Sequence, residues 1–159
     1  MKSLVIYHSQ FGNTKTLAES IGDALRGFGP STVVSLELAD VSTIPDVDLL
    51  VIGGPTQGHS TSPAMRAFLE RVAPAVRTIR VATFDTRLKG PEILWGSAAR
   101  STATRLQHAG IELVVAPESF MVKGARQPKL DEGEIERAGA WATAIGTQLA
   151  EPALPVTGA

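Results

Sequence analysis

The chain has 159 residues and a mass of 16.7 kDa, a length that suits a single domain. Hydrophobic residues make up 43% and charged residues 19%, which is too apolar for a disordered chain. The 15 basic and 16 acidic residues give a net charge of −1, which argues against a nucleic-acid binder and supports no polybasic membrane anchor. Because cysteine is absent, disulfides, thiolate nucleophiles and cysteine-held zinc or iron–sulfur clusters are excluded, and redox chemistry would need a bound cofactor.

The first third of the chain alternates short apolar runs with a helical pattern. Leu4–Tyr7 predicts a strand that is covered on both faces, because its apolar run is unbroken. Apolar residues at helical spacing then predict a helix over Asn13–Phe28, which glycine residues end. Two more strands are expected at Thr32–Leu38 and Leu49–Ile52, and a Gly-Gly-Pro sequence closes the second of them.

The middle of the chain continues this alternation. Ser62 followed by a proline predicts the start of a helix, since serine caps helices and proline suits the first helical position. The buried face of this helix would consist of four apolar side chains, those of Met65, Phe68, Leu69 and Val72. A strand at Ile79–Phe84 and a helix at Ser97–His108 are expected to follow.

The last part of the chain predicts one more strand and one more helix. The strand is expected at Ile111–Val115, and Ser119–Val122 would continue it after a break at a proline. Asp131 and Glu134 have the spacing of a capping box, which predicts the start of the last helix. Its buried face would consist of Ile135, Ala138, Ala142, Ile145 and Leu149, with Leu130 packing against Ile135 at its start.

Strands that alternate with helices imply an α/β fold, with one parallel sheet and helices on both of its faces. No repeat or linker divides the chain, so residues 1–150 are expected to form one domain and residues 151–159 a flexible tail. Ligands of such sheets bind outside the carboxyl ends of the strands. The loops after the first, third and fourth strands are therefore the places where a site is expected.

The first of these loops has the composition of an anion-binding turn. A short turn connects the first strand to the helix, and it consists of Ser9, Gln10, Phe11, Gly12, Asn13 and Thr14. Hydroxyls, amides and a glycine suit an anion at such a turn, because backbone N–H groups converge there and the helix dipole adds to them. The loop lacks the lysine of a P-loop NTPase, and the chain lacks the GxGxxG motif of a dinucleotide-binding Rossmann fold, so neither of those classes is favoured.

The segment Tyr7–Ala18 resembles the phosphate-binding segment of flavodoxins, and also the matching loop of the flavodoxin-like NAD(P)H:quinone oxidoreductases. The resemblance extends from Lys2 to about Ala150. It implies a doubly wound, five-stranded parallel sheet in the strand order 2-1-3-4-5. It also implies FMN as the cofactor, with the phosphate held by Ser9–Thr14.

The second loop is similar to the flavodoxin-family loop that lines one side of the isoalloxazine ring. It consists of Pro55, Thr56, Gln57, Gly58 and His59, and its Pro-Thr start is especially similar to the quinone oxidoreductase branch. The resemblance implies that the backbone at Gln57 and Gly58 faces N5 of the flavin, where a glycine peptide is free to turn. His59 would either cover the flavin or lie exposed. The same loop nearly matches the G-x-S-x-G elbow of hydrolases but ends in serine, which disfavours that class.

The third loop is expected to begin with Phe84, Asp85, Thr86 and Arg87, which the resemblance places against the pyrimidine edge and the dimethylbenzene side of the flavin. Flavodoxins typically supply an aromatic side chain and acidic residues here, whereas this segment is basic. The guanidinium of Arg87 near N1 and C2 would favour the anionic reduced flavin and raise the potential for its formation. Trp95 follows, and is expected either to shield the site or to pack in the core.

These patterns favour an FMN-binding, flavodoxin-like protein that transfers electrons to a redox protein or a small acceptor, without a catalytic residue of its own. One alternative is an FMN-dependent NAD(P)H:quinone oxidoreductase, which the second loop favours and the short third loop disfavours. Another is an interaction module that has kept the fold without the flavin, which the intact first loop disfavours. Metal sites, nucleic-acid partners and membrane partners are not expected.

Neither end of the chain carries a convincing targeting signal. Leu4–Tyr7 is too short for the core of a signal peptide, so a cytoplasmic protein is expected. Leu154–Gly158 matches the pattern that sortases cleave, but a single alanine follows it, so a chance match is favoured.

Charge is distributed unevenly along the sequence. Residues 77–129 hold nine basic and four acidic side chains, so the remainder is acidic. This excess is typical of a solvated surface, but typical flavodoxins are strongly acidic and dock on basic partners. A basic third-loop side therefore suggests an anionic substrate or a redox partner of the opposite charge.

Overall fold

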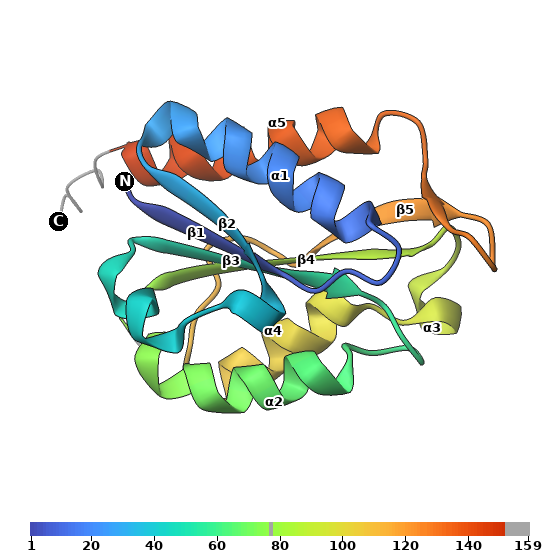
Figure 1. The fold of residues 1–159 in the computed structure, drawn as a ribbon, viewed down its shortest axis with the longest axis horizontal. Helices are drawn as coiled ribbons and strands as arrows, with labels where there is room; N and C mark the ends of the chain where they lie inside the picture. Colours follow the sequence, from blue (N-terminus) through green and yellow to red (C-terminus); the bar gives the residue numbers. More distant parts are fainter. Residues whose placement is uncertain (77, 152–159) are drawn as a thin grey trace, which may run out of the picture.

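The computed structural model describes residues 1–76 and 78–151, which form one six-stranded sheet with helices on both faces (Figure 1). The strand order is β2-β1-β3-β4-β5-β6, in which the first five strands are parallel and β6 is antiparallel to β5. The strands are β1 (Ser3–Tyr7), β2 (Ser31–Ser35), β3 (Leu49–Pro55), β4 (Arg80–Leu88), β5 (Glu118–Lys123) and β6 (Lys129–Leu130). The predicted fold class and the predicted order of five strands are confirmed, and the short β6 is added to them.

The helices form two layers. They are α1 (Asn13–Leu25), α2 (Pro63–Val72), α3 (Glu92–Trp95), α4 (Ala98–His108) and α5 (Glu134–Ala150). Figure 1 shows α1 and α5 over one face of the sheet and α2 and α4 over the other, while α3 lies at one end of the molecule beyond β4. No helix within the described ranges is both long enough and apolar enough to cross a membrane.

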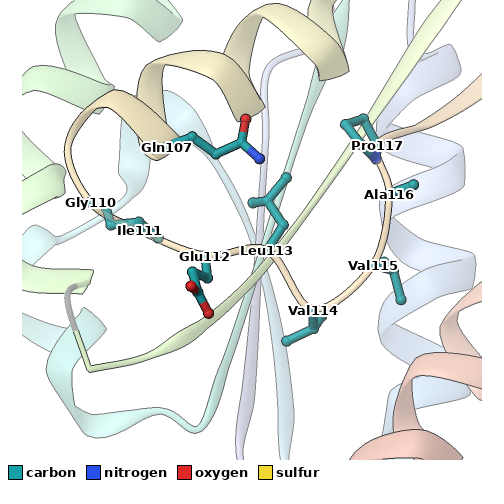
Figure 2. A pocket seen from close by; sticks show the side chains of 9 residues that line it. All are labelled: Gln107, Gly110, Ile111, Glu112, Leu113, Val114, Val115, Ala116 and Pro117. Atoms are coloured by element: carbon teal, nitrogen blue, oxygen red, sulfur yellow. The ribbon is translucent and has the colours of Figure 1, made fainter.

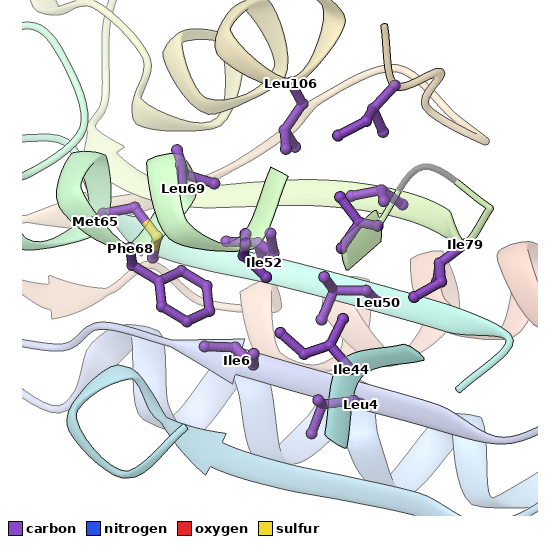
Figure 3. Close-up of a cluster of buried hydrophobic side chains, with 14 of the residues drawn as sticks. Leu4, Ile6, Ile44, Leu50, Ile52, Met65, Phe68, Leu69, Ile79 and Leu106 are labelled. Carbon is purple, nitrogen blue, oxygen red and sulfur yellow. The ribbon is translucent and has the colours of Figure 1, made fainter. Parts of the chain in front are cut away.

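The unbroken apolar runs of β1 and β3 supply two cores at once. Leu4 and Ile6 face α2 and α4, whereas Val5 faces α1 and α5, because successive side chains of a strand point to opposite faces. Figure 3 shows the first of these cores, where the strand residues meet Phe68 of α2 and Leu106 of α4. Covering both faces in this way leaves only the ends of the strands for a ligand.

Helix α2 begins as its sequence predicts. Ser62 precedes the helix, and its Oγ accepts a hydrogen bond from the amide of Met65 at 3.2 Å. Pro63 occupies the first helical position. All four side chains expected to be buried, those of Met65, Phe68, Leu69 and Val72, are buried.

The expected strand at Ile111–Val115 is wrong, because most of this segment does not pair with β4. Only Leu113 forms an isolated bridge, opposite Val81. The chain then leaves the sheet and rejoins it at Glu118, opposite Phe84. The segment first expected to be a mere continuation is therefore the main part of β5.

The expected strand at Ile79–Phe84 also needs correction, since β4 extends to Leu88. Pairing with Gly54 and Pro55 of β3 on one side, and with β5 on the other, keeps the backbone of β4 extended beyond Phe84. The residues expected to begin the third loop thus lie within a strand.

The start of α5 differs from the predicted capping box. Gly133, in the left-handed conformation at φ 80°, precedes the helix, and no side chain caps it. The carboxylate of Glu134 instead accepts a hydrogen bond from the amide of Met121 on β5 at 2.6 Å, and pairs with Arg137. Ile135, expected on the buried face, is exposed. The predicted tail and its Leu154–Gly158 match lie outside the described residues, apart from Glu151.

Candidate functional site

Two adjoining hollows lie at the carboxyl edge of the sheet, where β1, β3 and β4 end. One, of about 260 Å³, is lined by Thr56, Gly58, His59, Arg87, Leu88 and Trp95. The other, of about 180 Å³, lies between the β1–α1 loop and the β5–β6 hairpin, and its lining includes Gln10, Phe11, Pro55, Gln57, Thr86 and Pro128. Thr56, Arg87 and Leu88 line both, so the two hollows form one continuous groove.

A larger hollow of about 640 Å³ lies elsewhere, where residues 107–117 leave the sheet (Figure 2). Its wall consists of Gln107 at the end of α4 and the stretch of chain that follows up to β5, and Glu112 is the one charged side chain in its lining. It lies beside the first half of β4, away from the carboxyl edge. The site is therefore placed at the smaller hollows, to which several loops contribute polar groups.

The β1–α1 loop ends in a cluster of backbone donors. Gly12 adopts the left-handed conformation at φ 87°, and its amide donates to Ser9 Oγ at 3.0 Å. The next three amides, of Asn13, Thr14 and Lys15, have no acceptor among the described residues, and no side chain there caps α1. Free N–H groups at the positive end of a 13-residue helix form an anion-binding position.

The side chains of this loop are partly engaged within the protein. Asn13 Nδ2 donates to the carbonyl of Pro128 at 2.7 Å, which ties α1 to the β5–β6 hairpin. Thr14 is buried, and its hydroxyl shares a hydrogen bond with the hydroxyl of Thr86 at 3.0 Å. Gln10 and Phe11 are exposed at the rim. The loop would thus offer an anion its backbone more than the side chains of Asn13 and Thr14.

The β3–α2 loop contains a tight two-residue turn. Gln57 and Ser60 exchange backbone hydrogen bonds of 2.9 and 3.1 Å. The central residues Gly58 and His59 have φ values of 52° and 68°, which is the signature of a type I′ turn. His59 is the one residue other than glycine with a positive φ in the described ranges. Gln57 Nε2 also donates to Gln10 Oε1 at 3.0 Å, which links this turn to the β1–α1 loop.

The turn is held from outside by the chain around the start of α4. Gly96 lies so close to His59 that a Cβ on it would come within 2.1 Å of the His59 carbonyl oxygen. The hydroxyls of Ser60 and Ser101 share a hydrogen bond of 2.7 Å. The position of the Gln57–Ser60 turn is therefore coupled to the position of α4.

Phe84 and Asp85, both predicted for the site, are buried in β4. The ring of Phe84 packs edge-on against Phe120 and Trp141, and it occupies the space that a side chain at Gly53 would need. It therefore belongs to the core between the sheet and α5. Thr86 is buried as well, although it lines one hollow.

The carboxylate of Asp85 organises the root of the site. Its Oδ2 accepts hydrogen bonds from Thr56 Oγ1 at 3.1 Å, Ser97 Oγ at 2.6 Å and the amide of Ala99 at 2.9 Å. Thr56 Oγ1 in turn accepts from the amide of Ala98 at 2.9 Å. Burial raises the pKa of Asp85 above its ordinary value, against the opposing effect of these hydrogen bonds. The start of the β3–α2 loop and the start of α4 thus share one buried acid.

Arg87 is the cation that faces both hollows. Its Nη1 donates to the carbonyl of Gly90 at 2.8 Å, while its Nε is buried without a partner in the described ranges. Gly90, at φ 145°, lies against the indole of Trp95, where a Cβ would meet Nε1 at 2.5 Å. A positive charge and an aromatic wall therefore stand side by side at the groove.

The structure brings most of the predicted site residues to one edge. The loop residues from Ser9 to Gly12 and from Pro55 to His59 lie at the rim with Arg87, whereas Phe84 and Asp85 face inward. The sequence patterns gave no role in the site to Gly124–Pro128, the hairpin that closes one side of the groove. Gly124 and Pro128, which lie between the apolar residues Val122 and Leu130, were the sequence signal that could have predicted a turn here.

The comparisons with known proteins now define the class. The family model described as flavodoxin matches residues 5–141, so the chain belongs to the flavodoxin family. No curated protein matches it significantly. Family membership supports a flavin-binding, electron-transfer role.

Solved structures agree on the fold. A flavodoxin from the domain Archaea has a TM-score of 0.78 at 18% identity, covering 95% of this chain and 100% of its own. The two-electron reduced flavodoxin of Megasphaera elsdenii has a TM-score of 0.69 at 20% identity, with coverages of 89% and 98%. The flavodoxin, WrbA-like protein of Agrobacterium tumefaciens has a TM-score of 0.73 at 14% identity, with coverages of 92% and 96%.

Proposed function

We propose that the protein binds FMN at the carboxyl edge of its sheet and transfers electrons through it. The observation that carries this proposal is the start of α1, where the amides of Asn13, Thr14 and Lys15 have no acceptor within the described part of the chain. A phosphate is the group that such a cluster suits, since it accepts several hydrogen bonds and is stabilised by the helix dipole. Membership of the flavodoxin family supports the flavin as the rest of the ligand.

The groove offers groups that fit the remaining parts of FMN. The Gln57–Ser60 turn exposes Gly58, beside which a Cβ would find nothing within 4 Å, so a planar ring has room to approach the backbone. The unpartnered Nε of Arg87 supplies a donor and a positive charge. Trp95 supplies an aromatic surface at the rim, with 42% of its area exposed.

FMN would supply the one- or two-electron chemistry when bound, and the chain would position the cofactor and set its electronics. The α1 amides would hold the phosphate. Arg87 would stabilise negative charge that develops on the ring during reduction. Asp85, through Thr56, would fix where the Gln57–Ser60 turn stands relative to the groove.

The direct test is the colour and content of the purified protein. We expect absorption in the flavin region and FMN as the released cofactor by mass spectrometry. A colourless protein that also fails to take up added FMN would contradict the proposal and favour a flavin-free interaction module.

A second assay separates a carrier from an NAD(P)H:quinone oxidoreductase. The FMN-loaded protein is mixed with NADPH and a quinone, and the oxidation of NADPH is followed. A carrier is expected to oxidise NADPH slowly, and the short third loop, which lacks the longer glycine-rich insertion of the quinone oxidoreductases, favours this outcome. Steady oxidation of NADPH would contradict the carrier function and favour an NAD(P)H:quinone oxidoreductase.

A further inference from the structure

Helix α3 presents an apolar tip to solvent beside the groove. Ile93 is 93% exposed, Leu94 60% and Trp95 42%, in three consecutive positions. Phe11, on the far wall of the groove, is 55% exposed. Isolated exposed apolar residues are ordinary, but a cluster next to a ligand groove indicates a surface that another molecule covers.

Basic side chains lie across the groove from this tip, while Glu92 of α3 itself pairs with Arg100. Lys89 and Lys123 both approach the carboxylate of Asp131, at 3.3 and 2.5 Å, and the charge of Glu132 also acts on Lys123, so two acids face these two ammonium groups. Arg126 and Lys129 project from the β5–β6 hairpin, are exposed, and have no acidic partner in the part of the chain described. The hydrogen bond from Lys123 is the main reason that the pKa of Asp131 falls to about 2.

The apolar tip and the basic hairpin belong to one surface. Arg87 and Leu88 line one hollow with Trp95 and the other hollow with Gly124 and Pro128. Figure 1 shows α3 and the end of β5 at the same end of the molecule. The groove proposed for FMN therefore opens between them.

We propose that this surface, consisting of Ile93, Leu94, Trp95, Lys89, Arg126 and Lys129, docks an acidic redox protein. The proposal rests on the proposed function, because electrons would pass where the groove opens. An apolar contact ringed by carboxylates on the partner would match both the tip and the surrounding charge. A second copy of this chain fits poorly, since a two-fold contact would bring Arg126 and Lys129 against their own equivalents.

Binding is tested with two c-type cytochromes of opposite net charge, because haem quenches tryptophan fluorescence when it comes near. The background is Trp141→Phe, so that the signal comes from Trp95. At low ionic strength we expect the acidic cytochrome to bind about tenfold or more tightly than the basic one, and about 0.3 M salt to remove the difference. Equal affinities, or tighter binding of the basic cytochrome, would overturn the proposal.

Two variants divide the charge from the apolar contact. The double variant Arg126→Glu and Lys129→Glu should lower the affinity for the acidic cytochrome about tenfold, and only at low salt. Ile93→Ser should weaken it at every salt concentration. The matched control is Lys2→Glu with Arg105→Glu, an equal charge change at the other end of the sheet, which should leave binding unchanged. Loss of binding in the control alone, or no effect of either surface variant, would overturn the proposal.

The titrations are run with and without added FMN, and each is read against its own starting Trp95 fluorescence, so failure of docking and failure of FMN binding are distinguishable. Flavin absorbance of the same samples reports the second. Light scattering completes the test, since a dimer that Ile93→Ser converts to a monomer would mean that a second copy, and not an acidic partner, covers this surface.

Discussion

The hydroxyl of Ser97 donates a hydrogen bond of 2.6 Å to the buried carboxylate of Asp85, so the residue that caps the start of α4 is fixed to β4 beneath the groove. The same carboxylate oxygen accepts a hydrogen bond from the hydroxyl of Thr56, the residue that begins the β3–α2 loop. Because α4 also contacts the Gln57–Ser60 turn through Ser101, Asp85 links the β3–α2 loop to the start of α4.

Removal of this acid should loosen the site before the rest of the fold. Asp85→Ala leaves Ser97, Thr56 and the amide of Ala99 without their acceptor. Since each unsatisfied buried polar group costs roughly 1–3 kcal/mol, we expect the free energy of unfolding to fall by about 3 kcal/mol or more. Asp85→Asn keeps one acceptor oxygen and should lose much less. Urea denaturation gives the stabilities, and faster amide exchange at the Gln57–Ser60 turn should accompany Asp85→Ala.

The raised pKa of Asp85 predicts a particular pH dependence. The native state holds a proton on this carboxyl at pH values where the unfolded state, with its ordinary pKa near 3.8, has released it. The stabilising contribution of the neutral form is thus complete below pH 3.8 and is lost as the pH rises through the raised native pKa. Asp85→Asn cannot titrate, so its stability relative to the wild type should improve over that window. A constant difference from pH 4 to 8 would contradict this expectation.

Gly96 should be required by its contact and not only by its backbone conformation. Gly96→Ala places a Cβ against the His59 carbonyl, whereas Gly110→Ala, at a similar φ of 81°, meets nothing within 4 Å. Alanine pays a backbone cost at either positive φ, and the cost is larger at Gly96, whose ψ of −176° places it in a region essentially restricted to glycine. Crowding should cost Gly96→Ala about 1–3 kcal/mol more and weaken flavin binding. Equal stabilities of the two variants would show that the turn yields freely.

Arg87 should set the redox potential of a bound flavin. A tenfold weaker preference for the anionic reduced ring lowers a one-electron potential by about 59 mV, and Arg87→Ala is expected to produce a shift of that order. Arg87→Lys keeps the charge and should restore most of it. Spectroelectrochemical titration makes the measurement, with Arg105→Ala on exposed α4 surface as the control. If Arg87→Ala shifts the flavin potential no more than Arg105→Ala does, Arg87 does not set that potential.

Local signals in the sequence were sufficient for most of the fold. The Ser62–Pro63 start of α2 and the unbroken apolar run of β1 each indicate their element from a few neighbouring residues. They fix the alternation of strands and helices, and that alternation places the loops of the site at one edge.

Where two segments have similar local strand propensity, tertiary packing decides which of them forms the strand. Ile111–Val115 is as β-prone as Glu118–Lys123, but it leaves the sheet after one bridge. The end of β4 could not be predicted either, since Thr86 and Arg87 suit a strand or a loop and only pairing with β3 and β5 decides. The aromatic environment that buries Phe84 depends on Gly53, 31 positions away in the chain. The placement of FMN itself stays a prediction.

The central claim is that the start of α1 binds the phosphate of FMN. It is tested by titrating the flavin-free protein with FMN and with riboflavin, which lacks the phosphate, while flavin fluorescence is recorded. Hydrogen bonds to a charged group contribute about 1.5–3 kcal/mol each, so two of them predict an affinity for FMN at least about 100-fold greater. Equal affinities for the two flavins, or binding of neither, would contradict the account.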